Sequence, residues 1–239
     1  MDPEPFNTTR WTLIGRAVDG NPTVQRAALD ELCHRYMPAL RAYLVRNKRL
    51  PPEEADDVLQ GFLAGKILEQ GILDRAEPQR GRFRNFLLVS LNHYLVSCVR
   101  HEHARSRHAD LPDASLDPQM AAQAPDSSDV FNMEWARQLL ADALRRMHED
   151  CKSPLRRQSW IIFEQRVLKP TLLGGEPAEY DELVRRLNFK SPREAQNVLV
   201  NAKRRFIQCL RDAIADYEGP HADIDAEIQD LQRILSNRA

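Results

Sequence analysis

Apolar residues recur at intervals of three and four along most of this 239-residue chain, and this spacing is what most constrains its fold. In an α-helix such residues fall on one face, whereas a half-buried strand requires strict alternation. One set runs from Phe83 to Cys98 and another from Trp135 to Met147. Long β-branched runs are absent and aromatic residues make up only 7% of the chain, which disfavours strands. We therefore predict an all-α fold.

The helical pattern disappears between His108 and Ser128, where Pro, Asp, Ala, Ser and Gln predominate. This composition is typical of a linker, and the chain is long enough for two ordinary domains. We predict two helical domains joined by a flexible acidic linker. The expected parts are an N-terminal extension with a short helix (1–20), an N-terminal domain (21–107), the linker (108–132), a C-terminal domain (133–218) and an acidic extension with a short helix (219–239).

Charge is unevenly distributed, although the formal net charge is only −1. Between Arg185 and Arg211 there are eight basic residues and one acid, and between Arg75 and Arg107 seven arginines and two acids. The segment from His108 to Glu134 is acidic, and so is the segment from Asp212 to Ala239. Two such basic blocks predict two surfaces that bind a polyanion. We expect the acidic linker and tail to compete with random DNA for them.

The most complete local signal is a helix start at Ser191. Ser191 can cap the helix, Pro192 suits the first helical position, and Glu194 is placed as the reciprocal acid of a capping box. A shorter helix that contains Tyr180 to Leu187 comes before it, and the tight connection 188–190 joins the two helices. A short helix, a tight connection and a second, well-started helix together predict a helix-turn-helix.

On the second helix the spacing separates an inward face from an outward one. Arginine can form two hydrogen bonds with guanine, and Gln and Asn can do so with adenine. Outward residues of these types therefore suit base recognition in the major groove. The simpler interpretation of the Lys-Arg-Arg run is a solvated helix face. The inward set is Ala195, Val198, Leu199, Ala202, Phe206 and Leu210. The predicted DNA-binding residues are Arg193, Gln196, Asn197, Asn201, Lys203, Arg204 and Arg205, of which the last three suit phosphate contacts.

Glu179–Leu210 resembles the promoter-reading C-terminal domain of extracytoplasmic-function sigma factors. Ser191 matches the turn of that motif, and the run from Ala202 to Phe206 matches its basic end. Val198 and Asn201 stand where many members carry basic residues, so we expect a different base preference.

The N-terminal half carries its own resemblance to this family. Glu54–Phe62 resembles the helix that grips core RNA polymerase, and Phe83–Arg105 resembles the helices that open the promoter. Thr9–Leu13, Pro78–Arg84 and the acidic tail that ends near Ser236 are similar to a planctomycete-type sub-branch. The resemblance implies a sigma factor that binds core polymerase and directs promoter-specific initiation, with a region-two-like and a region-four-like domain. These domains would recognise the minus-ten and minus-thirty-five elements respectively.

The resemblance also implies roles for residues of the first domain. Arginines there would hold phosphates, and rings would stack on unstacked bases. Phe86 and Tyr94 also fall on the apolar stripe, where simple packing is the alternative role. The expected polymerase-binding residues are Asp56, Asp57 and Gln60. The expected minus-ten and melting contacts are Arg82, Arg84, Asn85, Phe86, Asn92, His93, Arg100 and Arg105. An anti-sigma factor, a regulatory kinase and the C-terminal extension all stay open as means of control.

Other classes of function find little support in the sequence. It has no Walker loop, Gly-rich phosphate cradle or GxSxG motif, and Cys98, His101 and His103 lack a nearby fourth metal ligand. Apolar stretches are too short for a membrane span, the N-terminus does not resemble a signal peptide, and the four cysteines form no CxxC pair. We expect a cytoplasmic non-enzyme without cofactor, metal or membrane partner. The alternatives are a helix-turn-helix regulator that binds an operator without polymerase, and a helical scaffold for an acidic protein.

Overall fold

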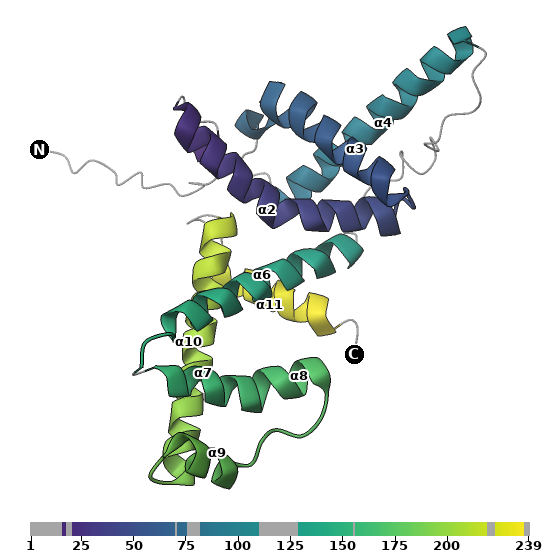
Figure 1. Ribbon diagram of the computed structural model, residues 1–239. Coiled ribbons are helices and arrows are strands. Elements are labelled where there is room, and N and C mark those ends of the chain that lie inside the picture. The colour runs from purple at the N-terminus through teal and green to yellow at the C-terminus, as the bar shows by residue number, and fades with distance from the viewer. Residues whose placement is uncertain are drawn as a thin grey trace, which may run out of the picture. The chain divides into compact units, whose positions relative to one another are not determined.

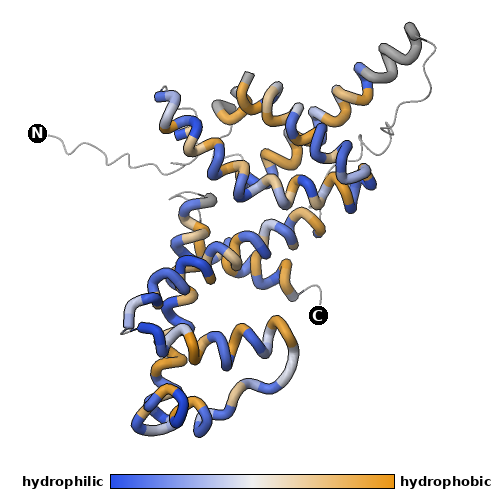
Figure 2. Tube along the Cα trace, in the orientation of Figure 1, coloured by the Kyte–Doolittle hydropathy of each residue, from blue (hydrophilic) through white to orange (hydrophobic). Residues whose placement is uncertain are grey.

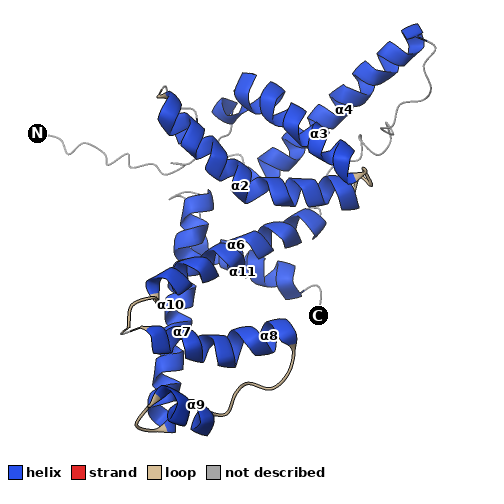
Figure 3. Cartoon of the chain, viewed as in Figure 1, coloured by secondary structure: helices blue, strands red, loops and turns tan. Residues whose placement is uncertain are grey.

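The computed structural model describes residues 16–17, 21–69, 71–75, 82–109, 129–154, 156–218 and 223–236. Every regular element within these ranges is helical, and Figure 3 shows helices joined by loops without a strand among them. The predicted all-α class is therefore confirmed for this part of the chain. Most of the expected linker and of the expected N-terminal helix lies outside the described residues.

By spatial contact the chain divides into two compact units, which are described separately below. The first unit contains residues 1–138 and 215–239, and the second contains residues 139–214. The division passes within helix α6 (Asp129–Asp150) and helix α10 (Pro192–Glu218). Helix α11 (Ile224–Ser236), at the end of the chain, therefore belongs to the first unit.

The first unit is built on α2 (Pro22–Arg46), α3 (Pro52–Phe62) and α4 (Phe83–Ala109). Asn21 starts α2, because its side-chain oxygen accepts hydrogen bonds from the N–H groups of Thr23 (3.0 Å) and Val24 (3.4 Å). A π-helical segment, Leu63–Glu69, continues α3, and a short 3-10 helix, Ile72–Arg75, precedes α4. Figure 1 shows these helices.

Aromatic rings join the three helices in the core of the first unit. The Tyr36 ring of α2 meets the Phe83 ring of α4 edge-on, with 5.3 Å between centroids. Phe62 of α3 lies 5.8 Å from the Tyr94 ring of α4. At Gly61 the approach is close, because a Cβ atom there would lie 2.3 Å from the Tyr94 hydroxyl. The absence of a side chain at Gly61 thus lets α3 and the Tyr94 ring pack together.

The second unit carries α7 (Arg157–Phe163), a π-helical segment (Glu164–Leu168), α8 (Lys169–Leu173), α9 (Tyr180–Leu187) and most of α10. Hydrophobic and hydrophilic residues alternate along its helices, as the orange and blue stretches of Figure 2 show. The buried residues of one cluster come from α7, α9, the following turn and α10, so these elements share a core. They are Ile162, Leu183, Phe189, Ala195 and Leu199.

Candidate nucleic-acid interface

The turn between α9 and α10 is fixed by local hydrogen bonds. Helix α9 ends at Asn188, whose backbone is left-handed (φ 56°, ψ 43°) and whose N–H donates to the Val184 carbonyl. Asparagine tolerates this conformation better than most residues. The next N–H, of Phe189, donates to the same carbonyl at 3.1 Å, and the Phe189 side chain is buried. The turn therefore anchors α9 to the core just before α10 begins.

Helix α10 begins with the Ser191 cap that the sequence predicts. The Glu194 N–H donates to the Ser191 hydroxyl at 3.2 Å, and the Lys190 N–H donates to the Glu194 carboxylate. The reciprocal bond thus reaches back one residue further than expected, to Lys190 instead of Ser191. Because Glu194 is turned toward this backbone N–H, the one acid in the basic block is engaged at the helix start.

Two contacts fix α9 against the preceding helices. The Arg166 guanidinium lies over the Tyr180 ring at 4.0 Å from its centroid and donates a hydrogen bond to the Ala178 carbonyl. The Gln158 side chain donates to the Leu187 carbonyl at 2.7 Å, near the end of α9. Both ends of α9 are therefore held.

The faces of α10 divide as the spacing predicts. Ala195, Leu199, Ala202 and Leu210 are buried, and Val198 and Phe206 are partly buried. The outward side chains are exposed, including Val200, whose methyl groups could contact a thymine methyl. The exposed members of the predicted set are Arg193, Gln196, Asn197, Asn201, Lys203 and Arg204.

Arg205 differs from its basic neighbours on α10. It is half-buried, and its guanidinium donates to the Asp150 carboxylate at 2.8 Å. Within the described residues, by contrast, the side chains of Arg193, Lys203 and Arg204 form no ion pair. The outward face of α10 therefore presents guanidinium and amide hydrogen-bond donors together with positive charge. Arg205 instead joins α10 to Asp150 of α6.

The predicted contacts of α4 fall into two groups. Asn85, His93 and Arg100 are exposed, and their spacing places them with Val89 on one helical face. Phe86 is partly buried, with its ring stacked beside Phe83 at 6.0 Å. The side chain of Arg105 lies outside the described part of the structure.

Asn92, by contrast, lies in the interior of the first unit. Its side chain is 4% exposed, and its oxygen accepts a hydrogen bond from the Tyr43 hydroxyl at 3.0 Å. Burial raises the pKa of Tyr43 to about 12. In this arrangement Asn92 serves the packing of α2 against α4 and is not presented to a ligand.

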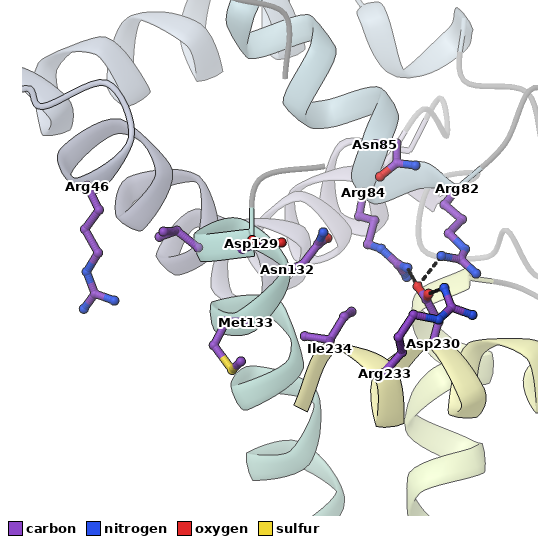
Figure 4. A pocket seen from close by; sticks show the side chains of 11 residues that line it. Arg46, Arg82, Arg84, Asn85, Asp129, Asn132, Met133, Asp230, Arg233 and Ile234 are labelled. Carbon is purple, nitrogen blue, oxygen red and sulfur yellow. Dashed lines mark hydrogen bonds and ion pairs between the residues drawn. The ribbon is translucent and has the colours of Figure 1, made fainter. Parts of the chain in front are cut away.

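Arg84 is buried as well, and a cluster of charges surrounds it. Its guanidinium donates to the carboxylates of Glu227 at 2.6 Å and Asp230 at 2.5 Å, and it lies 4.0 Å from the centre of the Trp135 ring. Arg82 pairs with the same two carboxylates of α11. Figure 4 shows Arg82 and Arg84 converging on Asp230.

Sequence reasoning did not identify Glu227 and Asp230. Both are buried, on the same face of α11 as Leu231. Carboxylates at positions that continue an apolar stripe are the signal that could have revealed them, because an unpaired charge is not buried there. The short helix expected in the acidic extension is present as α11, and Leu235 near its end is exposed.

A cavity of about 410 Å³ adjoins this cluster within the first unit. Figure 4 shows its lining side chains, which come from the end of α2 and from α4, α6 and α11. Two further arginines, Arg46 and Arg233, line it beside Arg82 and Arg84, and the acids in its wall are Asp129 and Asp230. The cavity is therefore rich in guanidinium groups.

The predicted polymerase-binding residues lie on α3. Asp57 and Gln60 are exposed on one face. Asp56 accepts two hydrogen bonds from Arg41, at 2.6 Å and 3.0 Å, and this pairing holds the pKa of the Asp56 carboxyl below its usual value. Asp56 is thus oriented by α2, whereas Asp57 and Gln60 point to solvent.

Comparison of the chain with protein-family models, with curated proteins and with solved structures finds no match. Its function must therefore be argued from its own residues. Among the described residues, none of the helices combines the length and apolar content of a membrane span. In the same part of the chain, no three His, Cys, Asp or Glu side chains gather as a metal site would require.

Proposed function

We propose that this chain is a transcription-initiation factor of the extracytoplasmic-function sigma type, which binds core RNA polymerase and recognises promoter DNA at two points. The second unit would read the minus-thirty-five element through α10. The first unit would dock on the polymerase and hold the melted minus-ten region.

The observation that carries this proposal is the pairing of α9 with the capped helix α10. A turn anchored by Phe189 and a start fixed by Ser191 leave one face of α10 open, and that face carries Arg193, Gln196 and Asn197 near its N-terminal end. This is the part of a recognition helix that reaches base edges. Lys203 and Arg204, further along, suit the phosphates on the flank of the groove.

Two exposed surfaces support the proposed role of the first unit. On α4, Asn85, His93 and Arg100 share a face that combines an amide, an imidazole ring and a positive charge, which suits an unpaired strand. On α3, Asp57 and Gln60 form an acidic and polar surface for a basic partner. In the arrangement described above, Arg84 and Asn92 support these surfaces from within.

A run-off transcription assay with purified core polymerase tests the proposal. A pool of genomic templates is transcribed by core polymerase with and without the chain, and the expected result is a set of discrete transcripts that require it. Asp57→Ala combined with Gln60→Ala should reduce these transcripts and weaken capture of the core enzyme. The matched control is Glu149→Ala, which removes an exposed acid of the second unit.

The outcomes separate the functional classes. Duplex binding at a defined sequence without any polymerase-dependent transcript would identify an operator-binding regulator and overturn the sigma assignment. Absence of both transcription and DNA binding would favour the remaining alternative, a helical scaffold for an acidic protein. Promoter-dependent transcripts that become weaker or less selective when an Arg193→Ala variant replaces the native chain would support the assignment.

A further inference from the structure

The first unit contains a charge cluster that joins segments distant in the sequence. Arg82 and Arg84, at the start of α4, meet Glu227 and Asp230 of α11, more than 140 residues later. The Arg84, Glu227 and Asp230 side chains are all nearly inaccessible to solvent, at 2%, 7% and 12% exposure. Arg233 of α11 pairs with Asp230 as well, at 2.8 Å, and the pairing of both carboxylates with guanidinium groups is what permits their burial.

The geometry of this cluster is that of a bound oxyanion. A guanidinium fork binds carboxylate and phosphate oxygens through the same donors, so either anion can occupy such a site. Arg84 spans both carboxylates and rests against Trp135, which fixes its plane. Removing one partner of a buried ion pair leaves an uncompensated charge, so α11 can leave this site only if another anion takes the place of its carboxylates.

We propose that α11 is an internal plug that occupies a phosphate-binding site at the start of α4, with Glu227 and Asp230 in the place of two backbone phosphates of the melted DNA strand. Binding of that strand displaces α11, and docking of α11 masks the site. The inference rests on the proposed function, because it takes promoter DNA as the competing anion.

Two features of the surroundings make this exchange feasible. Helix α11 has only 13 residues, and an isolated helix of that length is marginal in water, so its order depends on docking. The neighbouring cavity gives an incoming strand room beside Arg84, and Arg46 of α2, in its wall, supplies positive charge that does not depend on α11.

Neutralising the plug tests the proposal in the full chain. Glu227→Gln with Asp230→Asn keeps the side-chain shapes but removes both charges, and the probe is a fluorescein-labelled oligothymidine strand followed by fluorescence anisotropy. We expect roughly five- to hundredfold tighter binding than by the native chain, the usual range for coupling between two sites. Asp225→Asn, an exposed acid on α11, is the control and should change affinity by less than about twofold.

Hydrogen exchange of the native chain gives a second measurement that needs no variant. Amides of 224–236 should lose protection when the oligothymidine strand saturates the protein. The single change Asp230→Asn should give an intermediate gain in affinity, which covers the case in which the double variant does not fold. Unchanged affinity in the charge-neutralised variants, or a gain equal to that of Asp225→Asn, would overturn the plug. Run-off transcription by the native chain is scored separately, so the sigma assignment can stand if the plug fails.

Discussion

The outward face of α10 and the first half of α4 both carry predicted DNA contacts, yet the two helices use them differently. On α10 six of the seven predicted side chains are exposed, and the opposite face is apolar. On α4 the set is divided, with Arg84 and Asn92 inside and Asn85 and His93 outside. With α11 docked, the same residue types therefore serve as surface donors in the second unit and as buried partners in the first.

The difference lies in what the rest of the chain offers to each helix. The inward face of α10 meets an apolar core from nearby helices, so polarity alone decides which side chains face solvent. At α4, Tyr43 and two acids of α11 provide partners for buried polar groups. A buried polar residue is stable only where such a partner exists.

Replacing Arg84 should have the largest effect on stability. Arg84→Ala leaves Glu227 and Asp230 buried, with Arg82 as a shared partner and Arg233 on Asp230. Removing one member of a buried charge cluster costs about 3–5 kcal/mol. Arg100→Ala, on the exposed face of the same helix, should change the free energy of unfolding by less than about 0.5 kcal/mol. Urea unfolding measures both; equal effects would mean that the cluster is not desolvated.

Two glycines of neighbouring helical turns test the packing of Tyr94. A methyl group at Gly61 would lie 2.3 Å from the Tyr94 hydroxyl, whereas one at Gly65 meets nothing within 4 Å. We expect Gly61→Ala to destabilise the protein by about 1–3 kcal/mol through overpacking. Gly65→Ala should be neutral or stabilising by up to about 1 kcal/mol. Thermal unfolding of the pair distinguishes a packed Tyr94 from one that is free to stack on DNA, for which both changes would be harmless.

The neighbours Asn92 and His93 sharpen the comparison within one helix. Asn92→Ala removes the acceptor of the buried Tyr43 hydroxyl and should cost about 1–2 kcal/mol of stability. His93→Ala should leave stability unchanged and weaken binding of single-stranded DNA, because His93 is exposed. Chemical denaturation and fluorescence anisotropy together measure both effects, and the reverse pattern would contradict the assignment.

Tyr43 adds a pH dependence to this pair. Its folded-state pKa, about 12, lies above the ordinary value of 10, so the folded state retains a proton that the unfolded state loses. The contribution is present in full below pH 10 and is lost as the pH rises toward 12. Unfolding free energy should therefore fall across this alkaline window, and less steeply in a Tyr43→Phe variant.

The sequence was sufficient for features set by local rules. The spacing of apolar residues and the capping residues predicted the all-helical class, the Ser191 cap and the two faces of α10. These depend on residues a few positions apart, whose geometry a helix fixes.

The sequence was insufficient where partners lie far apart along the chain. Arg84 and Asn92 were expected to contact DNA because their residue types suit it, but Glu227 and Tyr43 occupy them in the fold. The spacing of apolar residues along a helix cannot show which distant residue will contact a polar side chain. The placement of α11 with the first unit likewise follows from contacts between segments separated by more than 100 residues.

The proposed function depends above all on DNA recognition by one face of α10. Selection from a randomised duplex pool, with the full chain bound to core polymerase, tests it most directly. The native chain should enrich a defined motif; Arg193→Ala and Gln196→Ala should each lose preference at one position, since a good bidentate contact gives about 1–3 kcal/mol of discrimination. Lys203→Ala should keep the motif, bind more weakly and show a shallower salt dependence, by about one phosphate contact. An unchanged motif in all three variants, or an identical loss in all three, would contradict the assignment of this face.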